Sequence, residues 1–249
     1  MAIPRLATDF LQKYGTMFRR NVFVPLRDFV YPPVCLTCDT LLEGEEEKIC
    51  ARCWNAIPGV REGDPAWTGL RERLGAEGVV SDFFSCYLFE KEGTLKEIVH
   101  LMKYRGMSSL GERLGREVGK RMRAKPEFMS PESLIPVPLN RLKERERGYN
   151  QAEEVCRGIS AETRLPVRSS YLIRRRYTES QTELDRDQRK ENVRGAFVLR
   201  PGSRPALKGR TFILVDDVIT TGSTVNACAT VLLENGAGRV LAVSAALAG

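Results

Sequence analysis

The chain has 249 residues, of which 42% are apolar and 29% charged, and this composition is typical of a globular protein. No apolar run reaches the roughly 18 residues that a membrane span needs, and the first residues lack the unbroken apolar core of a secretory signal, so we expect a cytoplasmic protein. The net charge is +7 and there is a single histidine, His100. Mechanisms that need two imidazoles are therefore excluded, and His100, within an apolar helical stretch, is interpreted as structural.

The first 32 residues carry apolar side chains at helical spacing, among them Leu6, Phe10 and Tyr14, with basic residues between them. This pattern predicts an amphipathic N-terminal segment over residues 1–32. We expect the segment to cover apolar surface of its own protein. A membrane surface and a partner helix are the alternatives.

Four cysteines follow as two CxxC pairs, Cys35 with Cys38 and Cys50 with Cys53, separated by 11 residues. Two such knuckles supply four thiolates to one tetrahedral Zn²⁺, which leaves no open position for a water molecule. We therefore predict a structural zinc module over residues 33–60, in preference to two disulfides or a redox pair. The isolated cysteines are expected to be buried; they are Cys86, Cys156 and Cys228.

Residues 61–78 are rich in glycine and polar residues and are predicted to be a linker. Over residues 79–249 strand-like and helix-like segments alternate, which favours an α/β domain with a mostly parallel sheet covered by helices. The expected strands are Val79–Phe89, Leu134–Val137, Val167–Ile173, Phe212–Val215 and Arg239–Leu247. The expected helices are Thr94–Tyr104, Leu110–Arg123, Tyr149–Glu162 and Ser223–Asn235.

The strand at Phe212–Val215 is followed directly by two acids, Asp216 and Asp217. Ligands bind at the carboxyl ends of strands in open α/β sheets. Because adjacent carboxylates repel each other, they cost stability unless a ligand uses them, and ribose hydroxyls are suitable donors. A loop of small residues then leads into a helix, so its N–H groups and hydroxyls suit a phosphate. The loop residues are Thr220, Thr221, Gly222, Ser223 and Thr224; the alternative is a plain turn in which Ser223 or Thr224 caps the helix.

This segment resembles the 5-phosphoribosyl diphosphate signature of type I phosphoribosyltransferases. With the four-cysteine module and the segments LMKYRG, PVPLNR, RERGYNQAE, QTELDRDQRKENVRGAF and VDDVITTGST, the chain is similar to the ComF family of competence-associated proteins. The resemblance extends from about Phe29 to the end. It implies a sheet of the type I phosphoribosyltransferase kind and, as in some members of the family, a part in DNA uptake.

The resemblance also implies that the chain binds 5-phosphoribosyl diphosphate or a related nucleotide together with Mg²⁺. Asp216 and Asp217 would be the catalytic pair that serves the ribose and Mg²⁺, and Thr220–Thr224 would hold the 5-phosphate. A loop over Arg174–Phe197 would close over the site. The diphosphate would be held by Asn140, Arg141 and Lys143, with Lys103 as a further candidate. Arg145 and Arg147 could add charge there; the alternative for these basic residues is the solvated start of a helix.

If the chain is an enzyme, the resemblance implies that a nitrogen acceptor attacks the anomeric carbon while diphosphate leaves, so no side-chain nucleophile is required. The alternative is a non-catalytic DNA-processing protein that senses a ligand, contacts single-stranded DNA or binds a competence helicase. The region Leu139–Arg200 holds 15 basic and 10 acidic residues and suits phosphates of any kind. Trp54 could stack a base or pack the core of the zinc module. A pure DNA binder, however, has no use for the acid pair.

Overall fold

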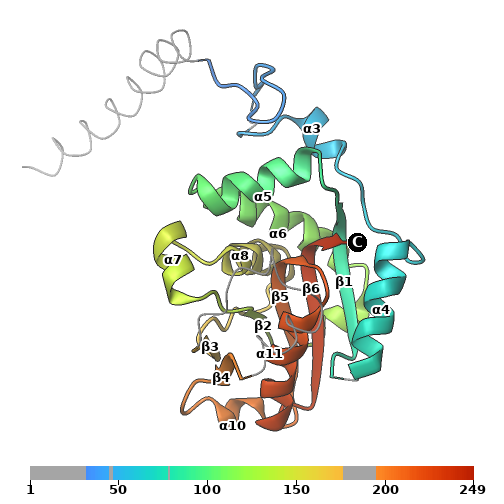
Figure 1. The fold of residues 1–249 in the computed structure, drawn as a ribbon, viewed down its shortest axis with the longest axis vertical. Helices are drawn as coiled ribbons and strands as arrows, with labels where there is room; N and C mark the ends of the chain where they lie inside the picture. The colour runs from blue at the N-terminus through green and yellow to red at the C-terminus, as the bar shows by residue number, and fades with distance from the viewer. Residues whose placement is uncertain (1–31, 45–46, 78, 176–194) are drawn as a thin grey trace, which may run out of the picture. The chain divides into compact units, whose positions relative to one another are not determined.

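The computed structural model describes residues 32–44, 47–77, 79–175 and 195–249 (Figure 1). The chain separates into two compact units, Met1–Ala56 and Ile57–Gly249. The amphipathic segment predicted over residues 1–32 lies outside the described residues except for its last residue. Residues 176–194, which make up most of the predicted closing loop, lie outside them as well.

The described part of the first unit is a small cysteine-bearing module. Its helix α3 (Ala51–Asn55) begins after Cys50, whose Sγ accepts a hydrogen bond from the N–H of Cys53 and so caps the helix. An isolated antiparallel bridge joins Val34 to Leu41. Ile49 and Trp54 are buried and give the module an apolar core of its own.

The second unit is built on a parallel sheet of four strands, in the order β1 (Asp82–Phe89), β6 (Arg239–Ala248), β5 (Thr211–Ile219) and β2 (Ser133–Pro136). The prediction of a parallel α/β sheet is therefore confirmed. A separate antiparallel pair consists of β3 (Leu172–Arg174) and β4 (Phe197–Leu199). The strand expected over Val167–Ile173 is shorter than predicted, since Val167 forms only a single bridge with Leu134.

Helices cover both faces of the sheet. Successive side chains of its strands point to opposite sides, so each face packs against its own helices. On one face, Phe212 and Leu214 of β5 share an apolar cluster with Val225 and Leu232 of α11 (Ser223–Glu234). On the other face, α6 (Ser108–Met122) and α8 (Gln151–Thr163) pack against each other and the strands. Other helical elements of the second unit are α5 (Thr94–Tyr104), η2 (Pro126–Phe128), α7 (Arg141–Arg147) and α10 (Arg204–Leu207).

The crossing of α6 and α8 depends on two glycines that let the helix backbones touch. A Cβ atom at Gly115 would stand 2.1 Å from the carbonyl oxygen of Val155, and one at Gly158 would stand 2.1 Å from that of Glu112. No side chain can occupy such a space, so small residues are required at the crossing. This close packing holds α8 against α6, and the first residues of α8 border the candidate site.

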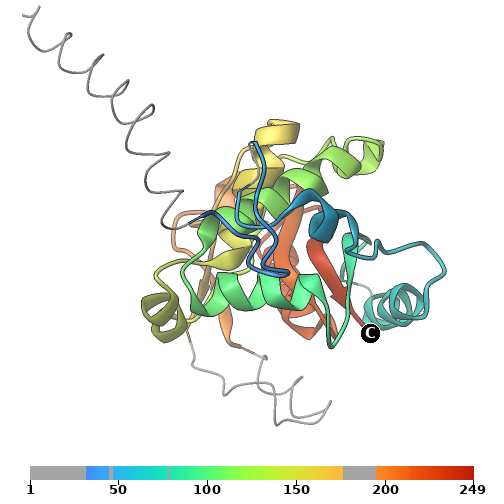
Figure 2. The ribbon, with the colours of Figure 1, turned by 90° about the horizontal axis from the view of Figure 1, so that it is seen from above.

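The linker predicted over residues 61–78 is wrong, because most of this stretch forms the helix α4 (Pro65–Glu77). Its Leu70 and Leu74 are buried in the cluster that contains α11, so the helix belongs to the second unit. Figures 1 and 2 show α4, in cyan, beside the C-terminal end of the chain, where Gly249 lies close to Ala66. In the part of the chain that the structure describes, no helix is both long and apolar enough to cross a membrane.

Candidate functional site

The four module cysteines have the geometry of a zinc site. The Sγ atoms of Cys35, Cys38, Cys50 and Cys53 all lie within 4.8 Å of one another, and those of Cys38 and Cys50 are 3.7 Å apart. Zn–S bonds of about 2.3 Å in a tetrahedron place sulfur atoms about 3.8 Å apart. All four cysteines are free of disulfides. The donor set therefore fits a closed, structural Zn²⁺ site, as the sequence predicts.

The surroundings of Cys38 favour its thiolate, whereas burial and the neighbouring cysteines raise the pKa of Cys53 in the absence of a metal ion. Contacts with Thr40, and the nearby Arg52, lower the pKa of Cys38 to about 5. Thiolates are the form that binds Zn²⁺. Trp54 is only 6% exposed, which supports the interpretation that it packs the module core rather than stacking a base. The three isolated cysteines outside the module are buried, as predicted.

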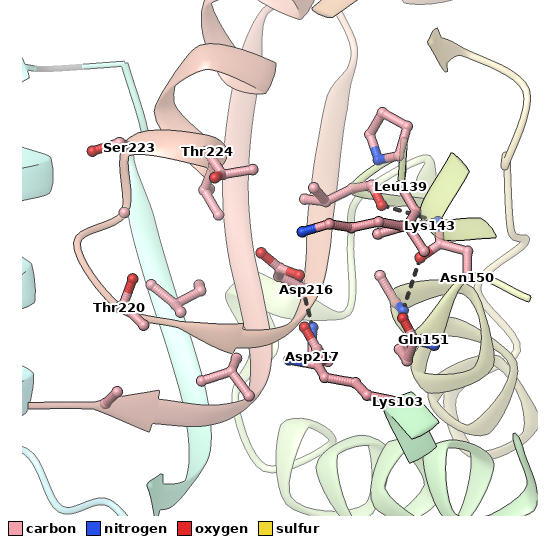
Figure 3. Close-up of a pocket in the computed structure, with 18 of the residues that line it drawn as sticks. Lys103, Leu139, Lys143, Asn150, Gln151, Asp216, Asp217, Thr220, Ser223 and Thr224 are labelled. Carbon is pink, nitrogen blue, oxygen red and sulfur yellow. Dashed lines mark hydrogen bonds and ion pairs between the residues drawn. The ribbon is translucent and has the colours of Figure 1, made fainter. Parts of the chain in front are cut away.

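A cavity of about 560 Å³ opens at the carboxyl ends of the strands of the second unit (Figure 3). One wall is the continuous stretch from Asp216 to Val225, which runs from the end of β5 into α11. The opposite wall comes from α5, α7 and the start of α8, through Lys103, Lys143 and Gln151 among others. Apolar side chains at the ends of β1 and β6, Phe89 and Ala248, also line the cavity, as does the segment Val137–Leu139 that follows β2. The cavity thus combines acids, hydroxyls and cations at the sheet edge where ligands bind.

The two acids lie within β5, which continues beyond the predicted Val215 to Ile219. Asp217 forms an ion pair with Lys103 of α5, Nζ to Oδ2 3.0 Å, whereas Asp216 accepts a hydrogen bond from the N–H of Asp217. Burial opposes the ionisation of Asp217, but the charge and hydrogen bond of Lys103 hold its pKa below the usual range. Burial, followed by the charge of Asp217, raises the pKa of Asp216 well above its usual value. Lys103 therefore stabilises the charge of Asp217, whereas burial and the neighbouring charge disfavour ionisation of Asp216.

The loop Thr220–Thr224, hereafter the 220–224 loop, has the backbone of an anion socket. Gly222 has a φ of +81°, which side-chain-bearing residues rarely adopt, and it immediately precedes the 12-residue helix α11. Thr221 Oγ1 accepts a hydrogen bond from the N–H of Ser223 and lies 3.0 Å from the Ser223 hydroxyl. Free N–H groups and the positive end of the dipole at a helix start attract phosphate. Figure 3 shows Thr220, Ser223 and Thr224 on the wall across from Lys143.

Three further cations face this cavity. Lys143 points into it from α7 (Figure 3), and Arg147, one helical turn later, donates to Gln151 Oε1 at 2.7 Å. Arg174 of β3 also lines the cavity, with its guanidinium 5.3 Å from the ring centre of Phe197. Burial, together with the charges of Arg147, Arg174 and Lys103, lowers the pKa of Lys143. Cations that repel one another in this way gain most from a bound polyanion.

The structure brings most of the predicted site together. Both acids, the whole 220–224 loop, Lys143 and Lys103 line one cavity. Asn140 and Arg141 do not line it: the Asn140 side chain caps α7 by accepting from the N–H of Leu142, and Arg141 borders a smaller neighbouring cavity. Arg147, which the sequence analysis named as a further source of charge, lines the cavity as well. Sequence reasoning missed Gln151 and placed Arg174 only at the start of the predicted closing loop. His100 is exposed on α5 and is not among the cavity residues.

Comparisons with protein families also distinguish a zinc module from a second domain. Residues 26–64 match the family described as double zinc ribbon domain, and residues 133–247 match the phosphoribosyl transferase domain. Among solved structures, a glutamine phosphoribosylpyrophosphate amidotransferase from Bacillus subtilis aligns at 20% identity over 54% of this chain and 26% of its own, with a TM-score of 0.36. A score that low does not establish a common fold. The fold of the second unit is shown instead by the family match and by the parallel sheet.

Curated relatives match more of the chain. The DNA utilization protein YhgH of Salmonella typhimurium is 32% identical over 210 residues, or 83% of this chain and 87% of the relative. Competence protein ComFC of Bacillus subtilis is 26% identical and covers 82% of this chain and 79% of the relative. The YhgH protein of Shigella flexneri is 33% identical over 149 residues, and this match spans only 64% of that relative. The chain belongs to the ComF/YhgH family, in which a double zinc ribbon precedes a domain of the phosphoribosyltransferase type.

Proposed function

We propose that this protein binds 5-phosphoribosyl diphosphate with Mg²⁺ in the cytoplasm and transfers its phosphoribosyl group to a nitrogen acceptor. The observation that carries the proposal is the cavity itself, in which an acid pair lies between an anion socket and a group of cations. A ribose with phosphate at one end and diphosphate at the other has the complementary pattern. Simple anion sites need no acids, so the pair Asp216 and Asp217 favours a ligand with hydroxyl groups.

Each part of the cavity then has a role in the reaction. The 220–224 loop would hold the 5-phosphate, and Asp217 would accept from ribose hydroxyls. Lys143 and Arg147 would hold the diphosphate and neutralise the charge that develops as it leaves. Mg²⁺, when bound with the ligand, would supply further positive charge at the diphosphate. The side chains of the cavity would thus orient the ribose for attack. The reaction requires no nucleophilic side chain.

The first prediction tests this reaction directly. Purified protein should bind phosphoribosyl diphosphate in the presence of Mg²⁺ and release diphosphate when a suitable acceptor from a panel of nucleobases, amines and ammonia is added. Lys143→Gln should lower affinity for inorganic diphosphate by about tenfold, because one charge-assisted hydrogen bond is lost. Isothermal titration and a coupled diphosphate assay measure both quantities.

The matched control is Arg141→Gln on the same helix, whose side chain borders the neighbouring cavity. It should leave diphosphate affinity unchanged. If the protein binds phosphoribosyl diphosphate but releases no diphosphate with any acceptor, it is a ligand sensor and not an enzyme. Absence of binding at millimolar ligand would contradict the proposal altogether.

A second candidate function is contact with single-stranded DNA, in a competence context that includes a helicase partner. The relatives' names, DNA utilization protein and competence protein, favour such a context. Within the second unit, α7 presents the exposed residues Arg141 and Arg145 on the helix that also carries Lys143 and Arg147 into the cavity. Exposed arginines of this kind contact phosphates without reading sequence.

The second prediction is therefore weak, salt-dependent binding of single-stranded DNA. Removing two phosphate contacts with Arg141→Ala and Arg145→Ala should reduce the slope of log affinity against log salt by about 1.4. Fluorescence anisotropy of a labelled oligonucleotide measures the slope, with Arg204→Ala on α10 as the control. Tight binding at physiological salt that survives Asp216→Asn would make DNA binding the primary function.

A further inference from the structure

Helix α4 contacts the 220–224 loop. The helix lies outside both matched family segments, since the first ends at residue 64 and the second begins at residue 133. Arg73 Nη2 donates a hydrogen bond to the backbone carbonyl oxygen of Thr220, with a distance of 3.2 Å. Leu70 and Leu74 lie against Gly222, where a Cβ atom would stand 2.9 Å from Leu74 Cδ2. Helix α4 therefore contacts the loop in two ways, through a hydrogen bond from Arg73 and through the apolar side chains of Leu70 and Leu74.

The hydrogen bond fixes the orientation of one peptide group. In a trans peptide the C=O of one residue and the N–H of the next point in opposite directions. Because Arg73 holds the Thr220 carbonyl toward α4, the N–H of Thr221 points away from α4. If this peptide turned over, a carbonyl oxygen would take the place of that N–H and would repel an anion. The guanidinium also places a positive charge directly behind the loop, where it favours a bound anion.

We propose that Arg73 is a positioning residue for the 5-phosphate: it holds the 220–224 loop in its anion-binding orientation and adds charge behind it. This inference rests on the proposed function, since it assigns a residue of α4 to one subsite of that ligand. It predicts that Arg73 serves the phosphate end of the ligand alone. The diphosphate end faces Lys143 and Arg147, on the other wall of the cavity.

The test, and the third prediction, compares two probes that report on the two ends of the cavity. Isothermal titration of the full chain should show that Arg73→Gln weakens ribose 5-phosphate about tenfold, as expected for loss of a charged hydrogen-bond donor. The affinity for inorganic diphosphate should remain within twofold of wild type. Arg73→Lys, which keeps the charge, should recover part of the loss. Arg71→Gln is the matched control on the same helix, because Arg71 packs on Trp67 and not on the loop.

The outcomes separate the inference from the proposed function. If wild-type protein binds neither ribose 5-phosphate nor phosphoribosyl diphosphate, the proposed function itself is overturned. If wild type binds and Arg73→Gln binds ribose 5-phosphate equally well, only the positioning role is overturned. Equal weakening of both probes would show that Arg73 acts merely on the fold. No recovery with Arg73→Lys, in a protein that melts like wild type, would overturn the contribution assigned to the charge of Arg73. Selective loss of ribose 5-phosphate with partial recovery supports the inference.

Discussion

Phosphoribosyl diphosphate with Mg²⁺ should raise the melting temperature of wild-type protein by about 5–10 °C, and Asp217→Asn should remove most of this shift. A ligand at about 100 times its dissociation constant adds roughly 2.7 kcal/mol to the free energy of unfolding. In a chain of this size, each kcal/mol moves the melting temperature by about 2–4 °C. Asp217 contributes because its carboxylate would accept from ribose hydroxyls. Differential scanning fluorimetry with and without ligand measures the shift.

The same substitution should lower the melting temperature of the empty protein. Asp217 pairs with Lys103 at 3.0 Å, and these side chains are 14% and 25% exposed, respectively. Asp217→Asn leaves the lysine without its anionic partner in a partly dry site, which costs about 1–2 kcal/mol, or roughly 2–8 °C. Among the described residues Asp216 has no ion-pair partner within 4 Å, and Asp216→Asn replaces a carboxyl whose pKa is already raised by burial and by Asp217. It should leave the empty protein nearly unchanged.

Asp216→Asn is thus the matched control for the baseline, while both variants should bind the ligand less well. An intact ligand shift in Asp217→Asn would show that the acid serves only the ion pair with Lys103. If wild-type protein shows no shift at any Mg²⁺ concentration, the acid pair and the 220–224 loop serve only the fold and do not bind this ligand.

The sequence predicts the sheet and the 220–224 loop well because both are local patterns. An apolar strand followed by acids and small hydroxylated residues dictates its own turn and helix start. The partner of Asp217 was not predictable in the same way, since Lys103 reaches it from α5, more than a hundred residues earlier. Repulsion between adjacent acids therefore suggested, wrongly, that the pair is uncompensated in the empty site.

Two errors share one cause, which is a helix hidden by its composition. In α4, glycines and charges around Leu70 and Leu74 conceal two buried positions at i and i+4 spacing. In α7, the charged run RLKERER hides a helix that begins after Asn140. Once α7 is helical, Lys143 and Arg147 share the face that lines the cavity, so these two of the basic residues named for the diphosphate enter the site and Arg141 does not. An N-cap asparagine followed by acid and base residues was the available signal.

Removal of one zinc ligand should have the largest effect on the first unit. Wild-type protein dialysed against a weak chelator should retain close to one zinc per chain, and Cys50→Ser should lose it. Binding of structural zinc contributes about 10–16 kcal/mol in small zinc modules, so loss of the metal should unfold this one. In the part of the module that the structure describes, few apolar residues other than the cysteines are buried, and Ile49 and Trp54 are among them. Metal analysis and near-ultraviolet circular dichroism of Trp54 report on the two events.

The matched control is Cys156→Ala, which removes a fully buried thiol from α8 of the second unit. It should keep the zinc, because the four sulfurs that lie within 4.8 Å of one another all belong to the module and Cys156 is not among them. Cys50→Ser should also leave the binding of phosphoribosyl diphosphate within about threefold of wild type, since every cavity residue belongs to the second unit. A wild-type protein that, prepared under reducing conditions, holds disulfides and no metal would contradict the zinc assignment. Loss of ligand binding in Cys50→Ser would instead show that the zinc module supports the cavity.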